Sequence, residues 1–189
     1  MINIKILNNF PKEVMDEFRN LYELKYKGNN PEQTWSDIHK ASIVPEKYLH
    51  HFNTMLPEPL VGLELYFVEP GKRMSAHVDR GRRTALQIPI DMDHENTYTF
   101  ACKHRDYSLL KPSNHTFMKE VTSVLNAPPA WFFEWDDEQF DTYNLELPVL
   151  QNVGHVHGGA NFSNRRRIFF SGSIITEFDQ AVENYKNWL

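Results

Sequence analysis

Two side chains that commonly bind metal ions, His77 and Asp79, stand two residues apart behind the apolar run Leu63-Glu-Leu-Tyr-Phe-Val68. Residues i and i+2 of a β-strand point to the same face, so an imidazole and a carboxylate at this spacing can hold one ion together. Such pairs also arise by chance in surface strands. A second histidine from elsewhere in the chain is therefore needed to make a metal site.

Two histidines that could complete the site follow in the stretch Pro148-Val-Leu-Gln-Asn-Val-Gly-His-Val-His-Gly-Gly-Ala-Asn161. His155 and His157 come after an apolar strand and before Gly158-Gly159, which would let backbone or ligand approach closely. Two imidazoles and one carboxylate form the facial triad of non-haem iron(II) oxygenases, which leaves coordination positions open for co-substrate and oxygen. Strand alternation cannot separate His155 from His157, because they are two residues apart.

Arg167 lies ten residues after His157 and heads an apolar strand, so we expect its side chain to point into a barrel mouth. A buried guanidinium is costly unless an anion pairs with it, preferably a carboxylate held by two hydrogen bonds. Arg165 and Arg166 follow a Ser-Asn turn and are expected to face solvent, although Arg165 stands in the same relation to His155. The alternative is that all three arginines form a solvated run of charge.

Helices in the first third of the chain and short strands after it must position these residues. Apolar residues recur at helical spacing after Pro11, at Val14, Phe18, Leu21 and Leu24, and a second helix is expected from Pro45 to Met55. From residue 60 onward the apolar runs are short and separated by turn residues, as in all-β proteins. The expected later elements are strands over Leu60–Val68, Met74–Asp79, Arg83–Ile90, Tyr98–Cys102, Trp131–Trp135, Val149–Val153 and Ile168–Ile175, with a helix over Glu177–Leu189; an opening strand is expected over Ile2–Leu7.

This order of elements predicts a mainly β fold, a sandwich or jelly roll with helices packed outside. A chain of 189 residues is expected to form a single domain. Its parts would be a mainly helical flank over 1–59, a β core over 60–175 and a C-terminal helix over 176–189. The polar stretch 103–130 is expected to be an insertion or a lid.

The charge, the cysteine count and the apolar runs of the chain limit the kinds of partner and the compartment that we expect. The 20 basic and 25 acidic residues give a formal charge of −5, which argues against binding to nucleic acid through its phosphates. Cys102 is the one cysteine, so an intrachain disulfide is impossible and a reducing compartment is expected. The N-terminus lacks the apolar core of a signal peptide, and apolar runs fall short of the roughly 18 residues of a membrane span. We therefore expect a cytoplasmic protein without membrane partners.

Taken in order, several of these residues form a pattern known from one enzyme family. The pattern consists of His77-Val-Asp79, Leu86-Gln-Ile-Pro-Ile90, Pro148-Val-Leu-Gln-Asn152, His157, Asn161 and Arg167. It resembles the iron(II)/2-oxoglutarate-dependent dioxygenases, especially the small hydroxylases of bacteria and phages related to prolyl and aspartyl/asparaginyl hydroxylases. The resemblance covers roughly residues 60–175 and leaves the N-terminal helices and the 103–130 segment unmatched.

The resemblance implies a double-stranded β-helix, a cupin-like jelly roll, in which His77, Asp79 and His157 bind Fe(II) and are the catalytic residues. His157 is preferred to His155 as the distal ligand because it lies five residues after Asn152, as in the family pattern. His155 would then be a neighbouring pocket residue or a structural one.

The resemblance also implies the co-substrates and the reaction. Arg167 would bind the distal carboxylate of 2-oxoglutarate, and O2 would convert 2-oxoglutarate to succinate and CO2 while a C–H bond of an amino-acid-like, peptidyl or other small-molecule substrate is hydroxylated. Tyr66, Gln87 and Arg83 are further candidates for contacts with the co-substrate or substrate, each with an ordinary role in the strand as its alternative. The competing functions are a non-catalytic barrel that binds a ligand or protein, and a metal-dependent isomerase or hydrolase.

Overall fold

The computed structural model of the protein describes residues 3–28, 33–34, 39–73, 76–79, 82–91, 96–104, 110, 132–133 and 138–189. Nearly all of the stretch 103–130, expected to be an insertion or a lid, lies outside these residues. No helix of the part described is long and apolar enough to cross a membrane.

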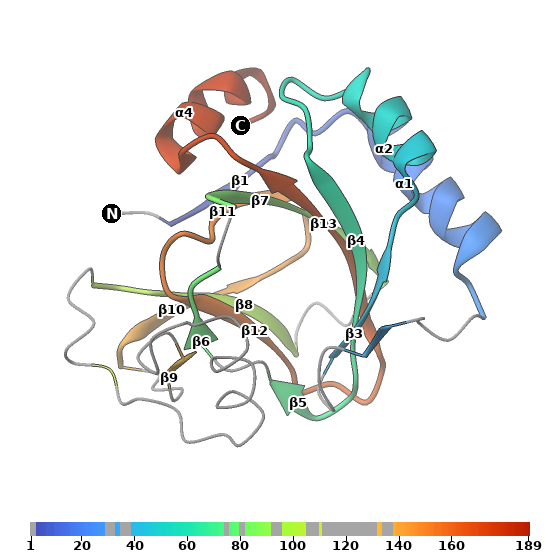
Figure 1. Ribbon diagram of the computed structural model, residues 1–189. Coiled ribbons are helices and arrows are strands. Elements are labelled where there is room, and N and C mark those ends of the chain that lie inside the picture. Colours follow the sequence, from blue (N-terminus) through green and yellow to red (C-terminus); the bar gives the residue numbers. More distant parts are fainter. Residues whose placement is uncertain are drawn as a thin grey trace.

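The strands form two antiparallel sheets that lie face to face (Figure 1). In the larger sheet the strand order is β1-β11-β7-β13-β4-β3-β2, and in the smaller it is β10-β8-β12-β6-β9, with β5 paired to β12. The larger sheet contains β1 (Ile4–Ile6), β2 (Gln33–Thr34), β3 (His39–Ile43), β4 (Gly62–Val68), β7 (Thr84–Asp91), β11 (Val149–Asn152) and β13 (Arg167–Ile174). The smaller contains β5 (Lys72–Arg73), β6 (Ala76–His77), β8 (Thr97–Cys102), β9 (Phe132–Phe133), β10 (Phe140–Asn144) and β12 (His157–Asn161).

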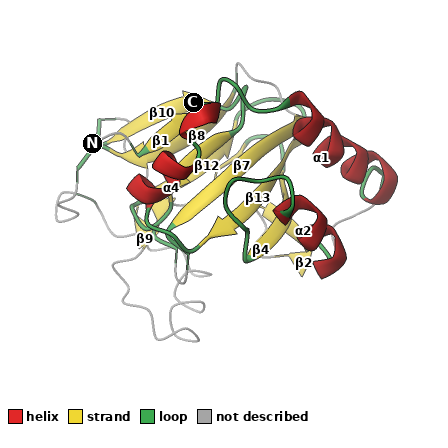
Figure 2. Ribbon diagram, turned by 90° about the horizontal axis from the view of Figure 1, so that it is seen from above, coloured by secondary structure: helices red, strands yellow, loops and turns green. Residues whose placement is uncertain are grey.

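Three helices cover the outer face of the larger sheet (Figures 1 and 2). They are α1 (Lys12–Lys25), α2 (Glu46–Asn53) and α4 (Phe178–Asn184), and a short 3-10 helix (Lys186–Trp188) follows α4. The helices α1 and α2 begin directly after Pro11 and Pro45, where the fixed φ of proline favours a helical start. The predicted mainly β fold with helical flanks is therefore confirmed.

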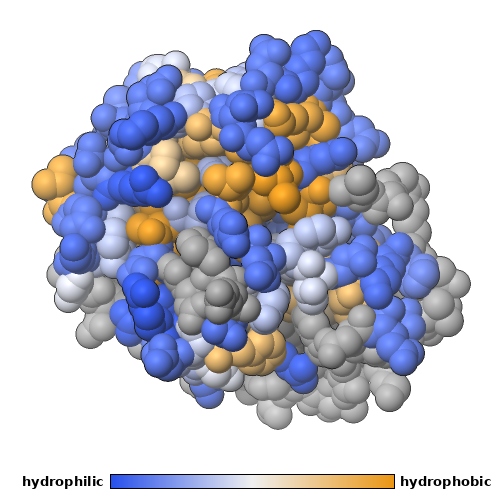
Figure 3. Space-filling model, turned by 180° about the vertical axis from the view of Figure 1, so that it is seen from behind, coloured by the Kyte–Doolittle hydropathy of each residue, from blue (hydrophilic) through white to orange (hydrophobic). Residues whose placement is uncertain are grey.

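Aromatic packing holds α1 and α2 to the sheet. The ring of Phe18 on α1 stacks on that of Phe52 on α2 with centroids 3.8 Å apart, and it lies 5.3 Å from the ring of Phe170 on β13. All three side chains are buried, and each contributes about 1.5–3 kcal/mol through the hydrophobic effect. On the face of the molecule shown in Figure 3, the most extended apolar patch lies in the upper part of the view, smaller apolar areas lie apart from it, and much of the remaining coloured surface is hydrophilic.

The alternation of side chains along β4 and β13 separates the helix-facing core from the space between the sheets. Phe67 and Phe170 belong to the core that packs on the helices. Their neighbours face the other way: Tyr66 lies opposite Phe169, and the two rings stack with centroids 5.4 Å apart. Arg167 stands on the same face as Phe169 because the two are two positions apart along the strand. This inner face of the larger sheet therefore carries two of the predicted site residues, Tyr66 and Arg167.

Candidate metal and anion site

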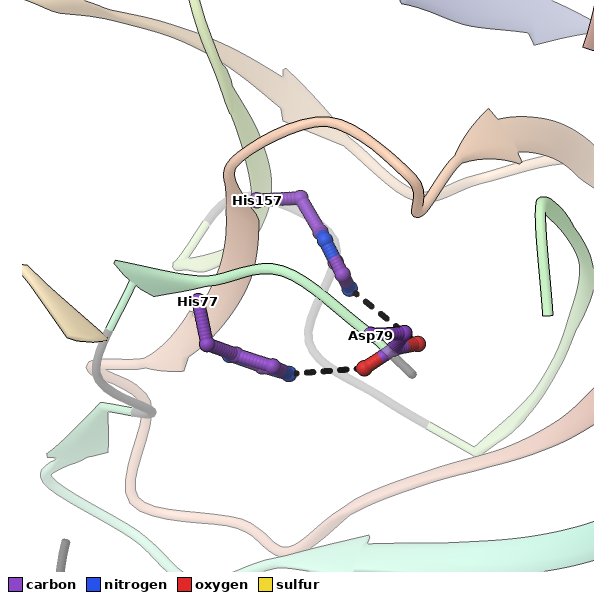
Figure 4. Close-up of side chains that lie close together, drawn as sticks. All are labelled: His77, Asp79 and His157. Atoms are coloured by element: carbon purple, nitrogen blue, oxygen red, sulfur yellow. Dashed lines mark ion pairs between the residues drawn. The ribbon is translucent and has the colours of Figure 1, made fainter. Parts of the chain in front are cut away.

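His77 and His157 meet across neighbouring strands of the smaller sheet. They are directly opposed where β6 pairs with β12, and their ring centroids lie 4.6 Å apart. Asp79 follows two residues after His77, beyond the end of β6, where its backbone N–H donates to the carbonyl of Val153 at 3.0 Å. The three side chains point toward one another (Figure 4).

The separations between the potential ligand atoms suit a metal ion. Nε2 of His77 lies 3.3 Å from Oδ1 of Asp79, and Nε2 of His157 lies 3.7 Å from Oδ2. With metal–ligand bonds of about 2.0–2.2 Å, ligand atoms at right angles lie about 3 Å apart. Within the described part of the chain, this is the one group of three such residues whose ligand atoms all lie within 4.8 Å of one another.

The hydrogen bonds of His157 direct its lone pair toward Asp79. Its Nδ1 lies 2.9 Å from the backbone carbonyl of His155. Because a carbonyl can only accept, Nδ1 carries the proton, and the Nε2 of the neutral ring is free to bind a metal. Burial lowers the pKa of His157 to about 3 against the opposing attraction of Asp79, so the ring is neutral near pH 7.

His155 does not join this group. It is buried, but its Nε2 lies 2.9 Å from the carbonyl of Cys102. The strand β12 begins only at His157, and His155 lies in the preceding turn. The alternation rule, which left the two histidines indistinguishable, therefore does not apply to His155.

Asp79 has a partner that the sequence analysis missed. Nε of Arg82 donates to Oδ2 of Asp79 at 2.5 Å, and Nη1 of Arg82 donates to Oγ of Ser171 at 3.0 Å. Burial by itself raises the pKa of Asp79, but Arg82 and the two histidines outweigh it and hold that pKa well below its usual range. The sequence analysis gave Arg82 no role; its position three residues after Asp79 is the signal that could have revealed it.

Arg167 is fully buried and connects the two sheets. From β13 it reaches β8, where Nη1 donates to the carbonyl of Tyr98 at 2.7 Å and Nη2 to Oγ1 of Thr99 at 2.8 Å. Its guanidinium carbon lies 4.6 Å from the centre of the Phe169 ring, and its buried Nε has no hydrogen-bond partner. None of the described carboxylates forms an ion pair with it. Burial lowers the pKa of Arg167 to about 10.

The two glycines of β12 make room for side chains of the chain itself. A Cβ at Gly159 would lie 2.8 Å from Nη1 of Arg167, and a Cβ at Gly158 would lie 2.3 Å from Cζ of Phe100. Real Cβ atoms essentially never come this close, so a side chain at Gly158 would push the Phe100 ring aside, and one at Gly159 would push the Arg167 guanidinium aside.

Gln87 acts on Arg167 through Thr99. The hydroxyl of Thr99 donates to Oε1 of Gln87 at 3.3 Å, so its lone pairs remain for the guanidinium of Arg167. The amide of Gln87 in turn donates to Oε1 of Gln151. Gln87 thus belongs to a polar network that orients the partner of Arg167.

The remaining two candidates differ in position. The hydroxyl of Tyr66 donates to Oε2 of Glu64 at 2.6 Å on the inner face of β4, where burial raises the pKa of Tyr66. Arg83 lies just before β7, and its Nε is 3.3 Å from Oε1 of Glu177. Its side chain is 59% exposed, so the structure does not bring Arg83 to the metal-ligand group.

Comparisons with known proteins give fold similarity without sequence similarity. No family model and no curated protein matches the chain. Among solved structures, the α-ketoglutarate-dependent carbocyclase SnoK of nogalamycin biosynthesis is 12% identical, with a TM-score of 0.55 over 90% of this chain and 78% of SnoK. The epimerase SnoN, solved with Fe3+, α-ketoglutarate and nogalamycin RO, is 10% identical, with a TM-score of 0.55 over 90% of this chain and 77% of SnoN.

A prolyl-4-hydroxylase from Pseudomonas putida is 13% identical with a TM-score of 0.49, over 90% of this chain and 89% of that one. At this level of identity, the two structures with a TM-score of 0.55 establish the fold. The predicted cupin-like jelly roll, a double-stranded β-helix, is confirmed.

Proposed function

We propose that this protein is an Fe(II)- and 2-oxoglutarate-dependent dioxygenase that hydroxylates a C–H bond of an amino-acid-like or peptidyl substrate, with release of succinate and CO2. The observation that supports this proposal most directly is the buried guanidinium of Arg167, which lies inside a barrel that also holds His77, Asp79 and His157. Two imidazole nitrogens and one carboxylate suit Fe(II) and leave its remaining positions open. The unbalanced positive charge suits the distal carboxylate of 2-oxoglutarate.

The donor set fits the proposed ion. His157 presents an unprotonated Nε2, His77 lies opposite it, and Asp79 supplies the one negative charge. Bound there, Fe(II) with 2-oxoglutarate and O2 supplies the oxidation of a C–H bond, coupled to loss of CO2 from 2-oxoglutarate.

Arg167 is built to receive an anion. Its two hydrogen bonds to Tyr98 and Thr99 fix the plane of the guanidinium, and its buried Nε–H has no partner. A carboxylate that accepts from this group gains charge-assisted hydrogen bonds without having to order the arginine. A zinc hydrolase could use the same three ligands, but it would leave the buried arginine without an explanation.

The proposal is tested in two steps on the purified protein. Fe(II) and 2-oxoglutarate are first added without oxygen, and we expect the visible charge-transfer band of the iron–keto-acid chelate. Oxygen is then admitted, and succinate is measured with a panel of amino acids and peptides. Absence of both the band and succinate would overturn the proposal in favour of a non-catalytic barrel or a hydrolase.

A further inference from the structure

We propose that Arg82 is a positioning residue that restricts Asp79 to one metal-binding oxygen and so keeps a coordination position open. This inference rests on the proposed function, in which Asp79 is a metal ligand. It goes further by giving a role to a residue outside the predicted site. Arg82 joins Asp79 to the larger sheet, because its guanidinium contacts both the Asp79 carboxylate and the hydroxyl of Ser171 on β13.

Asp79 needs such support because it does not belong to a strand. The strand β6 ends at His77, and within the described part of the chain the main chain of Asp79 is held by the hydrogen bond from its backbone N–H to the carbonyl of Val153. Its carboxylate is held by Arg82, whose Nε lies 2.5 Å from Oδ2. The side chains of Asp79 and Arg82 are 14% and 17% exposed, so water competes little for this contact.

Arg82 is itself anchored to β13. Its Nη1 donates to Oγ of Ser171 at 3.0 Å, and Ser171 lies four residues after Arg167 on the same inner face. The eight-residue strand β13 thus carries both Arg167 and Ser171, the residue that anchors Arg82. The proposed metal position and the proposed anion position are therefore fixed relative to each other.

The bond to Arg82 limits what Asp79 can offer a metal. An aspartate can bind a cation through one oxygen or through both. A second bond from Oδ2 would compete with the guanidinium, whereas Oδ1 faces Nε2 of His77 without that competition. Single-oxygen binding matters for the proposed reaction because the keto-acid end of 2-oxoglutarate and O2 together require the three positions left by the ligands.

The expected effect of removing Arg82 differs from that of a simple structural defect. In Arg82→Met, a positive charge near the metal is lost and Oδ2 becomes free, so metal affinity should stay level or rise. The affinity for 2-oxoglutarate should fall at least tenfold, because a second carboxylate oxygen competes for its position. If Arg82 were only a structural contact, its loss would instead lower the affinity for the metal and the affinity for 2-oxoglutarate together.

The experiment uses Co(II) in place of Fe(II), without oxygen. Co(II) is titrated into the wild-type protein and Arg82→Met, and the visible ligand-field spectrum, which depends on coordination number, is recorded. The affinity for 2-oxoglutarate is then measured by calorimetry on the Co(II) forms. Ser171→Ala, which retains the charge of Arg82 and removes its anchor, should shift the spectrum and the 2-oxoglutarate affinity in the same direction by less.

Arg165→Met is the matched control. Nη2 of Arg165 also lies 2.5 Å from an aspartate oxygen, Oδ1 of Asp91, but that pair is exposed. Its Co(II) spectrum and ligand affinities should equal those of the wild-type protein. An Arg82→Met protein with wild-type spectrum and 2-oxoglutarate affinity, or one that has lost Co(II) binding, would overturn the role of Arg82 while leaving the proposed function intact.

Failure of the wild-type protein to bind Co(II) or 2-oxoglutarate would overturn the proposed function, and the role of Arg82 with it. If Arg82→Met does not fold, the positioning role of Arg82 is tested with Ser171→Ala alone. An unchanged Co(II) spectrum and an unchanged 2-oxoglutarate affinity in Ser171→Ala would then contradict the proposal. Arg82→Lys, which keeps a cationic donor, should recover part of the 2-oxoglutarate affinity.

Discussion

Replacing Arg167 with methionine should abolish most of the affinity for 2-oxoglutarate and leave the ligand-free protein folded. Methionine has a similar length and no charge. The substitution therefore removes the proposed anion-binding group, and it also removes a guanidinium whose charge no described carboxylate balances. Loss of the anion-binding group changes the affinity for 2-oxoglutarate, whereas loss of the buried charge changes the free energy of unfolding, so the two consequences can be measured separately.

The expected magnitudes follow from the contacts of Arg167. Removing one partner of a buried charge pair costs about 2–5 kcal/mol of binding, which raises the Kd about 30-fold to several-thousand-fold. In the ligand-free protein, two hydrogen bonds to Tyr98 and Thr99 are lost, each contributing about 0.5–1.5 kcal/mol. The relief of the buried charge opposes this loss, so the free energy of unfolding should change by about 2 kcal/mol or less.

The affinity is measured by calorimetry on the Fe(II) protein without oxygen, and stability by urea unfolding of the metal-free protein. Arg166→Met is the control, because Nη2 of Arg166 pairs with Oε1 of Glu69 at 3.0 Å near the surface. A several-kcal/mol loss of stability in Arg167→Met, with 2-oxoglutarate affinity unchanged, would show that Arg167 is a structural link between the sheets and would refute the reasoning.

Three further changes test the same site. Gly159→Ala should displace the guanidinium of Arg167 and raise the Kd for 2-oxoglutarate about tenfold without a change in metal affinity; equal loss of both in titrations would contradict this. His157→Ala should lose metal binding in equilibrium dialysis, whereas His155→Ala should keep it and lower stability by about 0.5–1.5 kcal/mol, because the carbonyl of Cys102 loses one of its two donors and keeps the amide of Asn3; loss of metal binding in His155→Ala alone would exchange the roles of the two histidines. Removal of Fe(II) with a chelator should lower Tm, since saturation at 100 times the Kd stabilises by about 2.7 kcal/mol; a Tm unaffected by added Fe(II) would count against the site.

Much of the larger sheet could be predicted from the sequence because its strands are long and apolar. The strands predicted over Leu60–Val68 and Ile168–Ile175 agree with the bounds of β4 and β13 to within two residues. The helices α1 and α2 were likewise indicated by apolar residues at helical spacing after a proline. In these elements the local pattern and the tertiary packing agree.

Five of the described strands were not predicted, namely β2, β3, β5, β10 and β12, and the three longest of them lack an apolar pattern. The strand β12, His157–Asn161, contains two glycines, which have low β-propensity, and owes its form to pairing with β8 and β6. The strand β10, Phe140–Asn144, is largely exposed at the edge of its sheet, and β3, His39–Ile43, pairs with β4. Non-local pairing decides these segments, so a reading of local sequence misses them.

The candidate site divides in the same way. His77, Asp79 and Arg167 could be selected because their residue types and spacing are informative by themselves. The choice of His157 over His155 needed the resemblance, since it depends on where β12 begins. Thr99 was missed because its partner Arg167 lies far along the chain. Arg82 lies only three residues after Asp79, but its second partner, Ser171, is equally distant in sequence. Arg83 was considered for its spacing from Gln87, but it precedes β7 and pairs with a surface glutamate.

The most direct measurement is calorimetric titration of 2-oxoglutarate into the wild-type protein without oxygen, with and without Fe(II). The proposed site places the metal ligands His77, Asp79 and His157 and the anion-binding Arg167 in one barrel, so binding should involve both. We expect one 2-oxoglutarate per chain, bound at least tenfold more tightly when Fe(II) is present. Binding that is equally strong without the metal, or no binding in either condition, would contradict the central claim.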